Sequence, residues 1–489
     1  MKSVYLFLWL VGFPALMTAQ RDSVFGRSEF DDFRKELLGE YNDFRKEINA
    51  EYADFLSKAW KEYRLFQGKS ADKTPKPLQP IPYREIKDER DVVVEVTSEK
   101  VAMAEDVKPL DEELLMRELT KDSQVKGTSP LNLDYFGAEL QFRYQQTSFH
   151  LTSIVESSVG GLWKDISKSR FTSLLADMLA YKKEMQMNDW AYFLLAGKVA
   201  DRLSTLKSED GKAVFQHFLL VQSGYDVRLA RIDNFLVLLV PISEEVYFRP
   251  YLTIDDKLFY AISGKNLSSF SQIFTYQLPK MLIDKSHLSQ QMKKELRLPV
   301  HSKSYCVKAG GIAVLGEINI NQIRFYQAYL SCELSVYAEA RPSARIQRQL
   351  VSSLKSQLAG KSGGEALNTL LKWIQNGFRY QTDGQQFGYE KPFFIEENFY
   401  YPASDCEDRA ILFAYLVREV LGQEVILLDY PGHVSTAVCM GTEEVKGAYV
   451  VLDKKKYVIC DPTYMNADAG RLMPSCKGKR PKVIRLNYD

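Results

Sequence analysis

The feature that most constrains this chain is an apolar helix that begins near a cysteine and precedes a series of strands. Residues 401–418 read Tyr-Pro-Ala-Ser-Asp-Cys-Glu-Asp-Arg-Ala-Ile-Leu-Phe-Ala-Tyr-Leu-Val-Arg. The proline favours an extended start, Ser404 or Asp405 can cap the helix, and the acidic residues suit its positive N-terminal end. The pattern predicts a helix with Cys406 in its first turn. Strands are predicted after it, over residues 425–428, 434–438, 448–452 and 457–460.

Three residues in this part of the chain can form an activated thiol. The N–H groups at the start of a helix lower the pKa of a thiol there, so we expect Cys406 to favour the thiolate. His433 follows a Pro-Gly pair at the mouth of a strand and is the only histidine after His301. Asp461 ends a strand and precedes a proline. Cysteine, histidine and aspartate in this order predict a catalytic triad; the alternatives are a packing cysteine, a structural histidine and a turn aspartate.

The length of the chain implies several domains. Its 489 residues exceed what one hydrophobic core supports, so two or three domains are expected. The net charge of +1 argues against a nucleic-acid partner. We divide the chain into a signal peptide, an amphipathic helical arm, a Pro-rich and charged linker, an α+β domain and a catalytic domain, over residues 1–19, 20–67, 68–128, 129–340 and 341–489.

The N-terminal segment predicts export. Lys2 precedes a short apolar run that ends in small residues, which is typical of a secretory signal peptide with cleavage after Ala19. An uncleaved N-terminal anchor is the alternative. The run is too short to span a membrane, and no later stretch is apolar enough to be a transmembrane span. We therefore expect a periplasmic or extracellular protein, whose cysteines meet oxidising conditions.

The six cysteines suit either disulfides or a metal site without specifying one. None belongs to a C-x-x-C pair, and their density is low for a disulfide scaffold. The candidate disulfides are Cys306–Cys332 and Cys439–Cys460 or Cys439–Cys476. The residues that a zinc site would use are Cys406, His433, Cys439 and Cys460. Their spacing does not support such a site.

A repeat of eleven residues marks the N-terminal arm. Aromatic pairs recur at Phe30 and Phe33, Tyr41 and Phe44, and Tyr52 and Phe55. Eleven residues make three helical turns, so these side chains form one stripe along a helix over residues 27–66. We expect this helix to pack on the body of the protein or to pair with another helix; a docking arm for a partner is the alternative. An extended Pro-rich stretch and a surface-hugging charged connector follow, with a strand over residues 92–96.

The middle of the chain repeats the pattern around Cys406. Residues 213–230 parallel residues 410–427, and residues 251–260 parallel residues 449–457. We hypothesise an internal duplication in which the middle copy has lost its chemistry. Near the positions of the triad, the middle copy carries Glu209, Asn234 and Ser263. The alternative is that any helix–strand–strand unit shows this pattern. A later alternating stretch over residues 323–338 also reads as a strand.

The residues around the triad resemble the transglutaminase-like superfamily. The matching stretches, in the last quarter of the chain, are Ser-Asp-Cys-Glu-Asp-Arg-Ala over 404–410, Gly-His-Val over 432–434, Cys-Asp-Pro-Thr over 460–463 and Phe-Arg-Tyr over 378–380. The resemblance implies a papain-like core, in which a helix bearing the nucleophile packs on an antiparallel sheet that carries the histidine and the aspartate. The expected fold is therefore α+β, with this core at the C-terminus, preceded by a second α+β domain and an N-terminal amphipathic helix.

The resemblance implies acyl-transfer chemistry. Members of that superfamily include protein-glutamine transferases, peptidases and amidases, so the resemblance implies no one substrate. From the resemblance together with the predicted export, we expect a cysteine peptidase or amidase that hydrolyses a protein or peptide in a bacterial envelope, with His433 as the base for Cys406 and with Asp461 orienting the imidazole. The oxyanion donors would be the backbone N–H of Cys406 and a group of Tyr400 or Tyr401. The alternatives are a protein-glutamine amine transferase and a non-catalytic envelope binding or scaffold protein.

The acidic residues beside Cys406 raise the question of a metal ion. Asp405-Cys406-Glu407 resembles the exported bacterial transglutaminase-like cysteine proteinases, in which the acids flanking the nucleophile can bind calcium. The resemblance requires no cofactor, and calcium at Asp405 and Glu407 is one expectation. The other is that these acids only favour the helix N-terminus.

Overall fold

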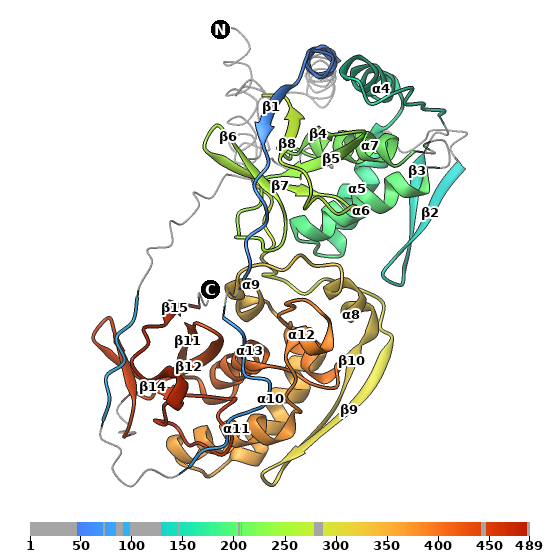
Figure 1. The fold of residues 1–489 in the computed structure, drawn as a ribbon. Helices are drawn as coiled ribbons and strands as arrows, with labels where there is room; N and C mark the ends of the chain where they lie inside the picture. The colour runs from blue at the N-terminus through green and yellow to red at the C-terminus, as the bar shows by residue number, and fades with distance from the viewer. Residues whose placement is uncertain are drawn as a thin grey trace, which may run out of the picture.

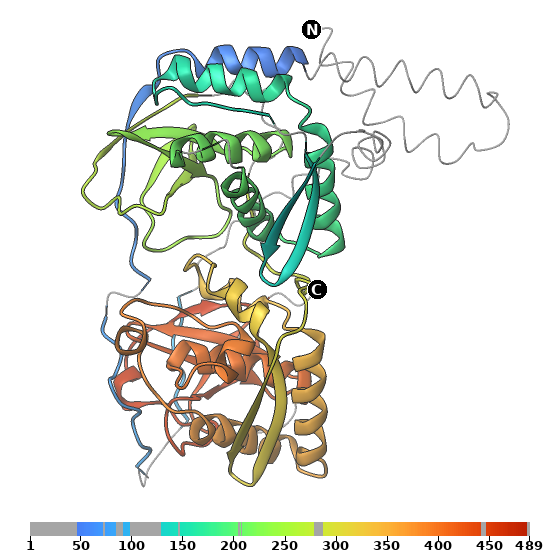
Figure 2. The ribbon, with the colours of Figure 1, turned by 90° about the vertical axis from the view of Figure 1, so that its right-hand side faces the viewer.

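The computed structural model describes residues 46–71, 74–84, 91–97, 129–144, 147–203, 206, 208–277, 287–441 and 446–486. The predicted signal peptide and the first half of the predicted arm lie outside these residues. The chain forms an upper and a lower α+β unit in Figure 1, and the side view in Figure 2 shows helices beside a sheet in each, which confirms the α+β class. Within the described ranges, no helix combines the length and hydrophobicity of a membrane span.

The middle unit contains a hairpin, a group of helices and an antiparallel sheet. Its elements are β2 (Ser129–Tyr135), β3 (Ala138–Tyr144), α4 (Glu156–Lys168), α5 (Thr172–Glu184), α6 (Asp189–Arg202), α7 (Glu209–Gln222), β4 (Arg228–Ile232), β5 (Phe235–Val240), β6 (Tyr251–Ile254), β7 (Lys257–Ile262) and β8 (Gln272–Thr275). The strand order of its sheet is β1-β8-β4-β5-β7-β6, in which β1 (Lys61–Arg64) comes from the N-terminal segment. Helix α7 packs on β4 and β5.

The C-terminal unit has a similar set of elements. They are β9 (Ser302–Ala309), β10 (Ile312–Asn319), α8 (Ile320–Tyr326), α9 (Leu334–Glu339), α10 (Ala344–Leu358), α11 (Gly363–Gly377), α12 (Asp383–Gln386), η2 (Ile395–Phe399), α13 (Cys406–Leu416), η3 (Val417–Leu421), β11 (Glu424–Tyr430), β12 (His433–Cys439), β13 (Tyr449–Leu452), β14 (Lys455–Cys460), η4 (Pro474–Cys476) and β15 (Lys482–Ile484). The strand order of its antiparallel sheet is β13-β14-β12-β11-β15.

Helix α13 lies inside the C-terminal unit. Every residue from Cys406 to Leu416 is buried, because α13 packs against β11, β12, α9 and α11. A helix that is apolar on all sides needs such surroundings. The expected helix packed on an antiparallel sheet is therefore present.

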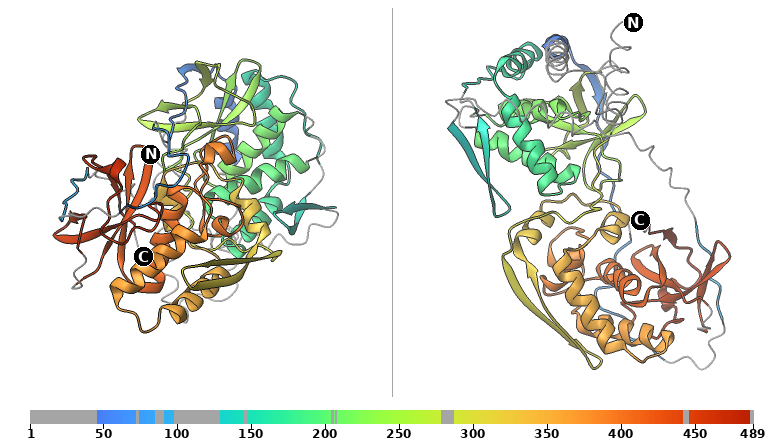
Figure 3. Two further views of the ribbon diagram at one scale, coloured as in Figure 1. Left: turned by 60° about the horizontal axis from the view of Figure 1, so that its bottom comes forward. Right: turned by 180° about the vertical axis from the view of Figure 1, so that it is seen from behind.

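The two units share one topology. Each has a hairpin along its flank in Figures 1 and 3: β2–β3 packs on α5 and α6, and β9–β10 packs on α10 and α11. Each continues with a central helix, α7 or α13, and a sheet with one strand order, since β8-β4-β5-β7-β6 corresponds to β15-β11-β12-β14-β13. A helix packed on a sheet is what the duplication hypothesis requires of the middle unit, and the common strand order supports that hypothesis.

The shared topology locates the counterparts of the triad in the middle unit. Glu209 is the first residue of α7, the place that the cysteine has in α13. Ser263 follows β7 as the triad aspartate follows β14. Phe235 opens β5 as the triad histidine opens β12, one residue beyond the expected Asn234. None of these side chains is a thiol or an imidazole, so the described middle unit has no triad at these positions.

Two predictions for the region between the units are wrong. The hairpin β9–β10 and the helix α9 pack with α10, α11 and α13, so the C-terminal unit begins near residue 302 rather than at residue 341. The stretch over residues 323–338 contributes to the helices α8 and α9 instead of a strand. Its tyrosines Tyr326 and Tyr337 pack against Phe394, and this tertiary packing outweighs the strand preference of aromatic residues.

The N-terminal helix packs on the middle unit. Residues 46–56 are helical, and Tyr52 and Leu56 are buried. A Cβ atom added to Gly160 of α4 would lie 2.6 Å from the carbonyl oxygen of Ala53, so the two helices touch at their backbones. Figures 1 and 2 show them side by side. The expectation that this helix packs on the body is confirmed for these residues, which therefore have their helical partner within the chain.

The N-terminal segment leaves the helix earlier than predicted. The helix stops at residue 56 instead of continuing to residue 66, and Lys61–Arg64 forms β1 beside β8. The edge of β8 supplies backbone partners that favour a strand there. The described residues 74–84 and 91–97 then lie along the C-terminal unit (Figure 1). Their isolated bridges to that unit are Pro82–Met465, Val93–Tyr449 and Thr97–Lys482.

A buried histidine links the N-terminal helix to the middle unit through hydrogen bonds. Nε2 of His217 lies 3.1 Å from the hydroxyl oxygen of Tyr52 and 3.0 Å from that of Tyr276. Burial lowers the pKa of His217 to about 3. The imidazole of an unfolded chain has a pKa of about 6.5, so between these two values only the unfolded state binds the proton. Stability is therefore lost as the pH falls below about 6.5.

We expect this histidine to contribute a pH dependence to folding. Between pH 7 and pH 5, the wild-type chain should lose about 2 kcal/mol more of its free energy of unfolding than His217→Gln, at about 1.4 kcal/mol per titrated pH unit. Urea titrations of both chains at the two pH values measure the difference. Equal losses in the two chains would show that His217 is not the titrating group.

Candidate active site

The three predicted triad residues lie where α13 meets two neighbouring strands. Cys406 opens α13, His433 opens β12, and Asp461 follows the last residue of β14. Strand β12 pairs with β14 and packs against α13, so the sheet brings these residues into one region. All three are buried, with exposed fractions of 0%, 4% and 2%.

The histidine and the aspartate form a hydrogen-bonded pair. Nε2 of His433 lies 2.8 Å from Oδ2 of Asp461. A carboxylate accepts, so the neutral imidazole carries its proton on Nε2 and presents the lone pair of Nδ1. This Nδ1 atom is buried and has no hydrogen-bond partner among the described residues. It is therefore the nitrogen that can take a proton from a thiol.

The aspartate is fixed by the backbone and by a glutamine. Oδ1 of Asp461 accepts hydrogen bonds from the N–H groups of Thr463 and Tyr464, at 2.9 and 3.1 Å. Nε2 of Gln375 on α11 donates to the carbonyl oxygens of Asp461 and Ala467, both at 3.0 Å. These bonds hold the carboxylate toward the imidazole. Sequence reasoning missed Gln375, whose only signal is a polar residue on the buried face of an amphipathic helix.

The thiol faces a carboxylate rather than the imidazole. Sγ of Cys406 donates to Oε2 of Glu407 at 3.2 Å. Burial raises the pKa of the Cys406 thiol, and the negative charges of Glu407 and Asp405 raise it further, while the ammonium group of Lys76 acts in the opposite direction. The prediction that the helix N-terminus favours the thiolate is wrong for this arrangement. Burial and two adjacent carboxylates outweigh the helical N–H groups.

Four carboxylates gather beside this thiol. Oxygen atoms of Asp383, Glu390, Asp405 and Glu407, which we call the acidic pocket, lie within 4.8 Å of one another. Nζ of Lys76 lies 2.5 Å from Oε2 of Glu390 and 3.0 Å from Oδ2 of Asp405. The same ammonium group also pairs with Glu407. A lysine from the N-terminal segment therefore occupies the acidic pocket next to the candidate nucleophile.

The ammonium group sets the ionisation of the acidic pocket. Burial would raise the pKa of Glu407, but the charge of Lys76 lowers it to about 2. For Asp383, burial and the negative charges of Asp408 and Glu407 prevail and raise its pKa to about 10. The charge of Lys76 thus keeps Glu407 ionised, whereas burial and the neighbouring negative charges keep Asp383 protonated at neutral pH.

The predicted calcium ligands belong to this pocket. Asp405 and Glu407 lie together with two further acids, and calcium prefers several carboxylate oxygens, so the donor set fits such an ion. The same oxygens hold the ammonium group of Lys76. An ion and Lys76 would therefore exclude each other.

Two neighbouring residues of α13 have a structural role. Asp408 accepts hydrogen bonds from the N–H groups of Asp405 and Phe393, at 3.1 and 2.8 Å. Arg409 donates to the carbonyl oxygen of Phe378 at 2.6 Å. These bonds tie the start of α13 to two loops that precede it in the chain, which fixes the position of the thiol.

The tyrosines predicted as oxyanion donors are engaged elsewhere. The N–H groups of Tyr400 and Tyr401 both donate to the carbonyl oxygen of Glu397, at 3.0 Å. The hydroxyl group of Tyr401 accepts a hydrogen bond from Gln327 at 3.0 Å. The backbone N–H groups of these tyrosines are therefore engaged by η2, whereas the oxyanion role of their hydroxyl groups stays a prediction. The oxyanion role of the Cys406 backbone stays a prediction.

Tyr380 is better placed to bind an oxyanion. Its hydroxyl group donates to the carbonyl oxygen of Pro77 at 2.8 Å. Burial raises the pKa of Tyr380. The backbone of Tyr380 pairs with that of Ser404, two residues before Cys406, which brings the phenol near the start of α13. A phenol that already binds a carbonyl oxygen near the nucleophile is a candidate oxyanion donor. Sequence reasoning used residues 378–380 only for the resemblance and missed this role.

The candidate disulfides are not formed among the described residues, and the residues of the zinc site that the spacing argued against are engaged separately. His433 pairs with Asp461, and the thiol of Cys460 donates to the carbonyl oxygen of Val458 at 3.6 Å. All six cysteines carry free thiols. The thiol chemistry of the site therefore rests on Cys406.

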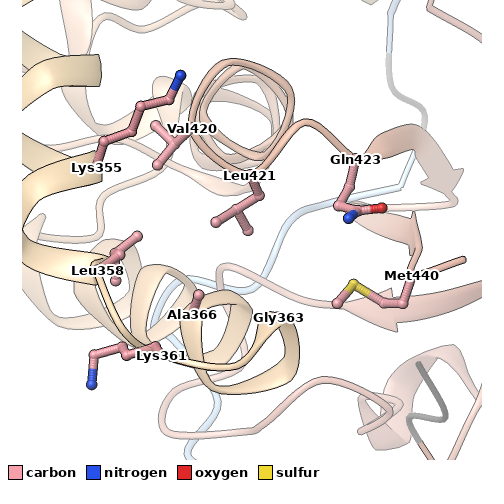
Figure 4. A pocket seen from close by; sticks show the side chains of 9 residues that line it. All are labelled: Lys355, Leu358, Lys361, Gly363, Ala366, Val420, Leu421, Gln423 and Met440. Carbon is pink, nitrogen blue, oxygen red and sulfur yellow. The ribbon is translucent and has the colours of Figure 1, made fainter. Parts of the chain in front are cut away.

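An open pocket lies at the other end of α13. Its lining comes from α10, α11, η3 and the residue after β12, and includes Lys355, Leu421 and Met440 (Figure 4). Its volume is about 240 Å³. Cys406 begins α13, whereas η3 follows the C-terminal end of that helix, so this pocket is separate from the triad.

Comparison with known proteins adds no further information about this site. No protein-family model, no curated protein and no solved structure matches the chain. The function is therefore inferred from the geometry of the site.

Proposed function

We propose that this protein is an exported, transglutaminase-like cysteine enzyme that hydrolyses peptide or amide bonds by acyl transfer. The observation that carries the proposal is the buried pair of His433 and Asp461. Nδ1 of His433 has no hydrogen-bond partner among the described residues, and the strand β12 that bears this histidine packs against the helix of Cys406. The helix-on-sheet arrangement supports the resemblance. The N-terminal sequence supports a periplasmic or extracellular location.

The reaction would begin with proton transfer to the imidazole. Cys406 exchanges its contact with Glu407 for Nδ1 of His433, which takes the thiol proton while Asp461 stabilises the imidazolium. The thiolate attacks the amide carbonyl carbon, and the backbone N–H of Cys406 and the hydroxyl of Tyr380 bind the negative oxygen. The amine leaves with the proton from His433, so a thioester remains on Cys406. Water then attacks this thioester with His433 as the base, which releases the acid and restores the thiol.

Trapping with hydroxylamine tests this function. The full-length chain is incubated with hydroxylamine and a peptide digest of an envelope proteome, and mass spectrometry detects the hydroxamates that form from the thioester. Wild type should give hydroxamates and new C-termini, and Cys406→Ala should give none. Cys439→Ser is the matched control, because this partly exposed thiol lies outside the triad. Since Lys76 occupies the acidic pocket, the assay is repeated in a Lys76→Met chain. Absence of Cys406-dependent products in both backgrounds would contradict the proposal.

Tyr380→Phe tests the oxyanion donor. Removal of one such donor typically lowers kcat by 10²–10³-fold, so we expect a loss of about 100-fold in kcat with KM nearly unchanged. Steady-state kinetics on a peptide identified by the trapping experiment measure this split. A change in KM alone would assign the hydroxyl to ground-state binding instead.

A non-catalytic binding protein is the second candidate. It is favoured by the complete burial of Cys406 and by the raised pKa of its thiol. The trapping experiment decides between the two candidates, because a scaffold forms no thioester. Transfer to an amine is the remaining alternative, and incorporation of a labelled primary amine into glutamine in the same assay would reveal it.

A further inference from the structure

Residues 74–77, which we call the Lys76 segment, have the sequence Thr-Pro-Lys-Pro, belong to no helix or strand and lie against the candidate active site. A Cβ atom added to Gly432 would lie 3.0 Å from the carbonyl oxygen of Pro75, so the segment touches the turn that precedes the triad histidine. The carbonyl oxygen of Pro77 accepts the hydrogen bond from Tyr380. The Lys76 segment therefore contacts both the base side and the proposed oxyanion side of the thiol.

Between these two contacts, the side chain of Lys76 enters the acidic pocket. Its side chain is 6% exposed, and those of Asp405 and Glu407 are 0% and 4% exposed. A buried ammonium group needs charge-assisted hydrogen bonds to offset its desolvation, and the carboxylates supply them. Oδ1 of Asp405 is also buried and receives no N–H or O–H donor from the described residues. The pocket therefore surrounds a cation and holds one further buried oxygen that has no partner among the described residues.

The Lys76 segment makes two kinds of contact with the site, one through its backbone and one through the side chain of Lys76. Pro75 and Pro77 have no N–H groups, so the residues on either side of Lys76 cannot donate backbone hydrogen bonds. The contact with Tyr380 uses a carbonyl oxygen, which any peptide offers. The ion pairs of Lys76 with Glu390, Asp405 and Glu407, in contrast, depend on the identity of its side chain. The lysine side chain therefore adds charge recognition to contacts that any peptide backbone can make.

We propose that the acidic pocket is a subsite for the ammonium group of a lysine in an extended substrate peptide, and that Lys76 fills this subsite in the resting chain. The term substrate rests on the proposed function, whereas the binding itself does not require catalysis. A tethered segment has an effective concentration on the order of mM, so it competes strongly with a free peptide. A lysine-bearing peptide gains access when the Lys76 segment leaves, and the segment keeps the thiol covered until then.

Peptide binding to an emptied pocket tests this proposal. The protein is the full-length Cys406→Ala/Lys76→Met chain in EDTA, and the probes are fluorescent Thr-Pro-Lys-Pro and Thr-Pro-Met-Pro peptides with blocked ends. Fluorescence anisotropy should show saturable binding of the lysine peptide and at least tenfold weaker binding of the methionine peptide. The Cys406→Ala chain, which retains Lys76, should bind the lysine peptide at least tenfold more weakly than the double variant.

A substitution of Glu390, at the rim of the acidic pocket, provides a second test of lysine binding. The side chain of Glu390 is 25% exposed and pairs with Lys76. Glu390→Gln in the double variant should weaken the lysine peptide by about tenfold and leave the methionine peptide unchanged. Equal binding of the two peptides, or no binding of either, would overturn the proposal and make Lys76 a permanent internal ion pair.

A second variant guards against loss of folding. Pro75→Gly/Pro77→Gly in the Cys406→Ala chain loosens the Lys76 segment but keeps its cation, and should bind the lysine peptide more tightly than Cys406→Ala alone. Unchanged binding would count against the proposal. Lysine-specific binding without any Cys406-dependent hydroxamate would support the subsite and contradict the proposed enzyme. Cys406-dependent hydroxamates that form equally on peptides with and without lysine would support the proposed enzyme and contradict the subsite.

Discussion

His433→Ala is expected to lower the rate of Cys406-dependent hydroxamate formation by about 10³-fold, within the range usual for loss of a general base. The reason is the state of the thiol. Burial and adjacent carboxylates raise the pKa of Cys406, so few thiolates exist at neutral pH unless a base takes the proton. Nδ1 of His433 is the buried nitrogen positioned for this role. The rate is measured by quantitative mass spectrometry with the peptide found by trapping.

The control for this loss is His150→Ala, which removes an exposed histidine of the middle unit and should leave the rate unchanged. Comparison of Asp461→Asn with Asp461→Ala measures how much the hydrogen bond from His433 to residue 461 contributes to the rate. The asparagine oxygen can still accept the hydrogen bond from Nε2 of His433, so Asp461→Asn should lose less activity than Asp461→Ala. A His433→Ala chain that keeps more than a tenth of the wild-type rate would assign the base to another group, with Glu407 as the first candidate because it already accepts from the thiol.

Lys76→Met is expected to raise the rate of hydroxamate formation by at least tenfold. The lysine anchors the Lys76 segment over the thiol through carboxylates of the acidic pocket, whereas methionine has similar length and no charge. Removal of one partner from a buried charge cluster typically costs about 3–5 kcal/mol, which favours release of the segment and solvation of the carboxylates. Opening the site then admits the peptide that the segment excludes.

A smaller effect opposes this gain. The ammonium group of Lys76 lowers the pKa of the thiol, so its loss alone would reduce the thiolate fraction. Exposure of Cys406 to water acts the other way, because burial is the largest cause of the raised pKa. We expect the gain in access to outweigh the change in pKa, because the covered thiol can react only after the segment leaves. A lower rate in Lys76→Met would show instead that the lysine assists the chemistry.

Lys69→Met is the matched control for this prediction. Lys69 belongs to the same extended stretch and pairs with Glu245 of the middle unit, but its side chain is 54% exposed and does not reach the acidic pocket. An exposed ion pair contributes at most about 1 kcal/mol, so the rate should change by less than twofold. Lys76→Arg keeps the charge and should retain most of the inhibition. Circular dichroism confirms that each variant is folded.

Local sequence was sufficient for the elements that depend on neighbouring residues. The cap and apolar run after Tyr401 predicted α13, and the stretches predicted as strands after it form the sheet. The order of Cys406, His433 and Asp461 predicted residues that the fold gathers in one region. These predictions succeed because caps and hydrophobic period act within a few residues.

Local sequence was insufficient where packing competes with propensity. The aromatic stripe of the arm predicted one long helix, but the edge of β8 draws Lys61–Arg64 into a strand. The alternating stretch over residues 323–338 predicted a strand, but its tyrosines pack on Phe394 from helices. Gln375 and Tyr380 were missed as partners of the site because their roles depend on loops that lie far away in the chain.

The state of the thiol could be learned only from the folded chain. From the sequence, Cys406 at a helix N-terminus predicted a lowered pKa, and Lys76 was one residue of a Pro-rich linker. In the structure, Lys76 pairs with Asp405 across 329 positions of sequence, and the thiol is buried among carboxylates. The sequence determines which ionisable groups are present, whereas their burial and charge pairing depend on which of them the tertiary fold brings into contact. Contacts between distant segments therefore decide how the predicted nucleophile is covered and which side chain its pocket holds.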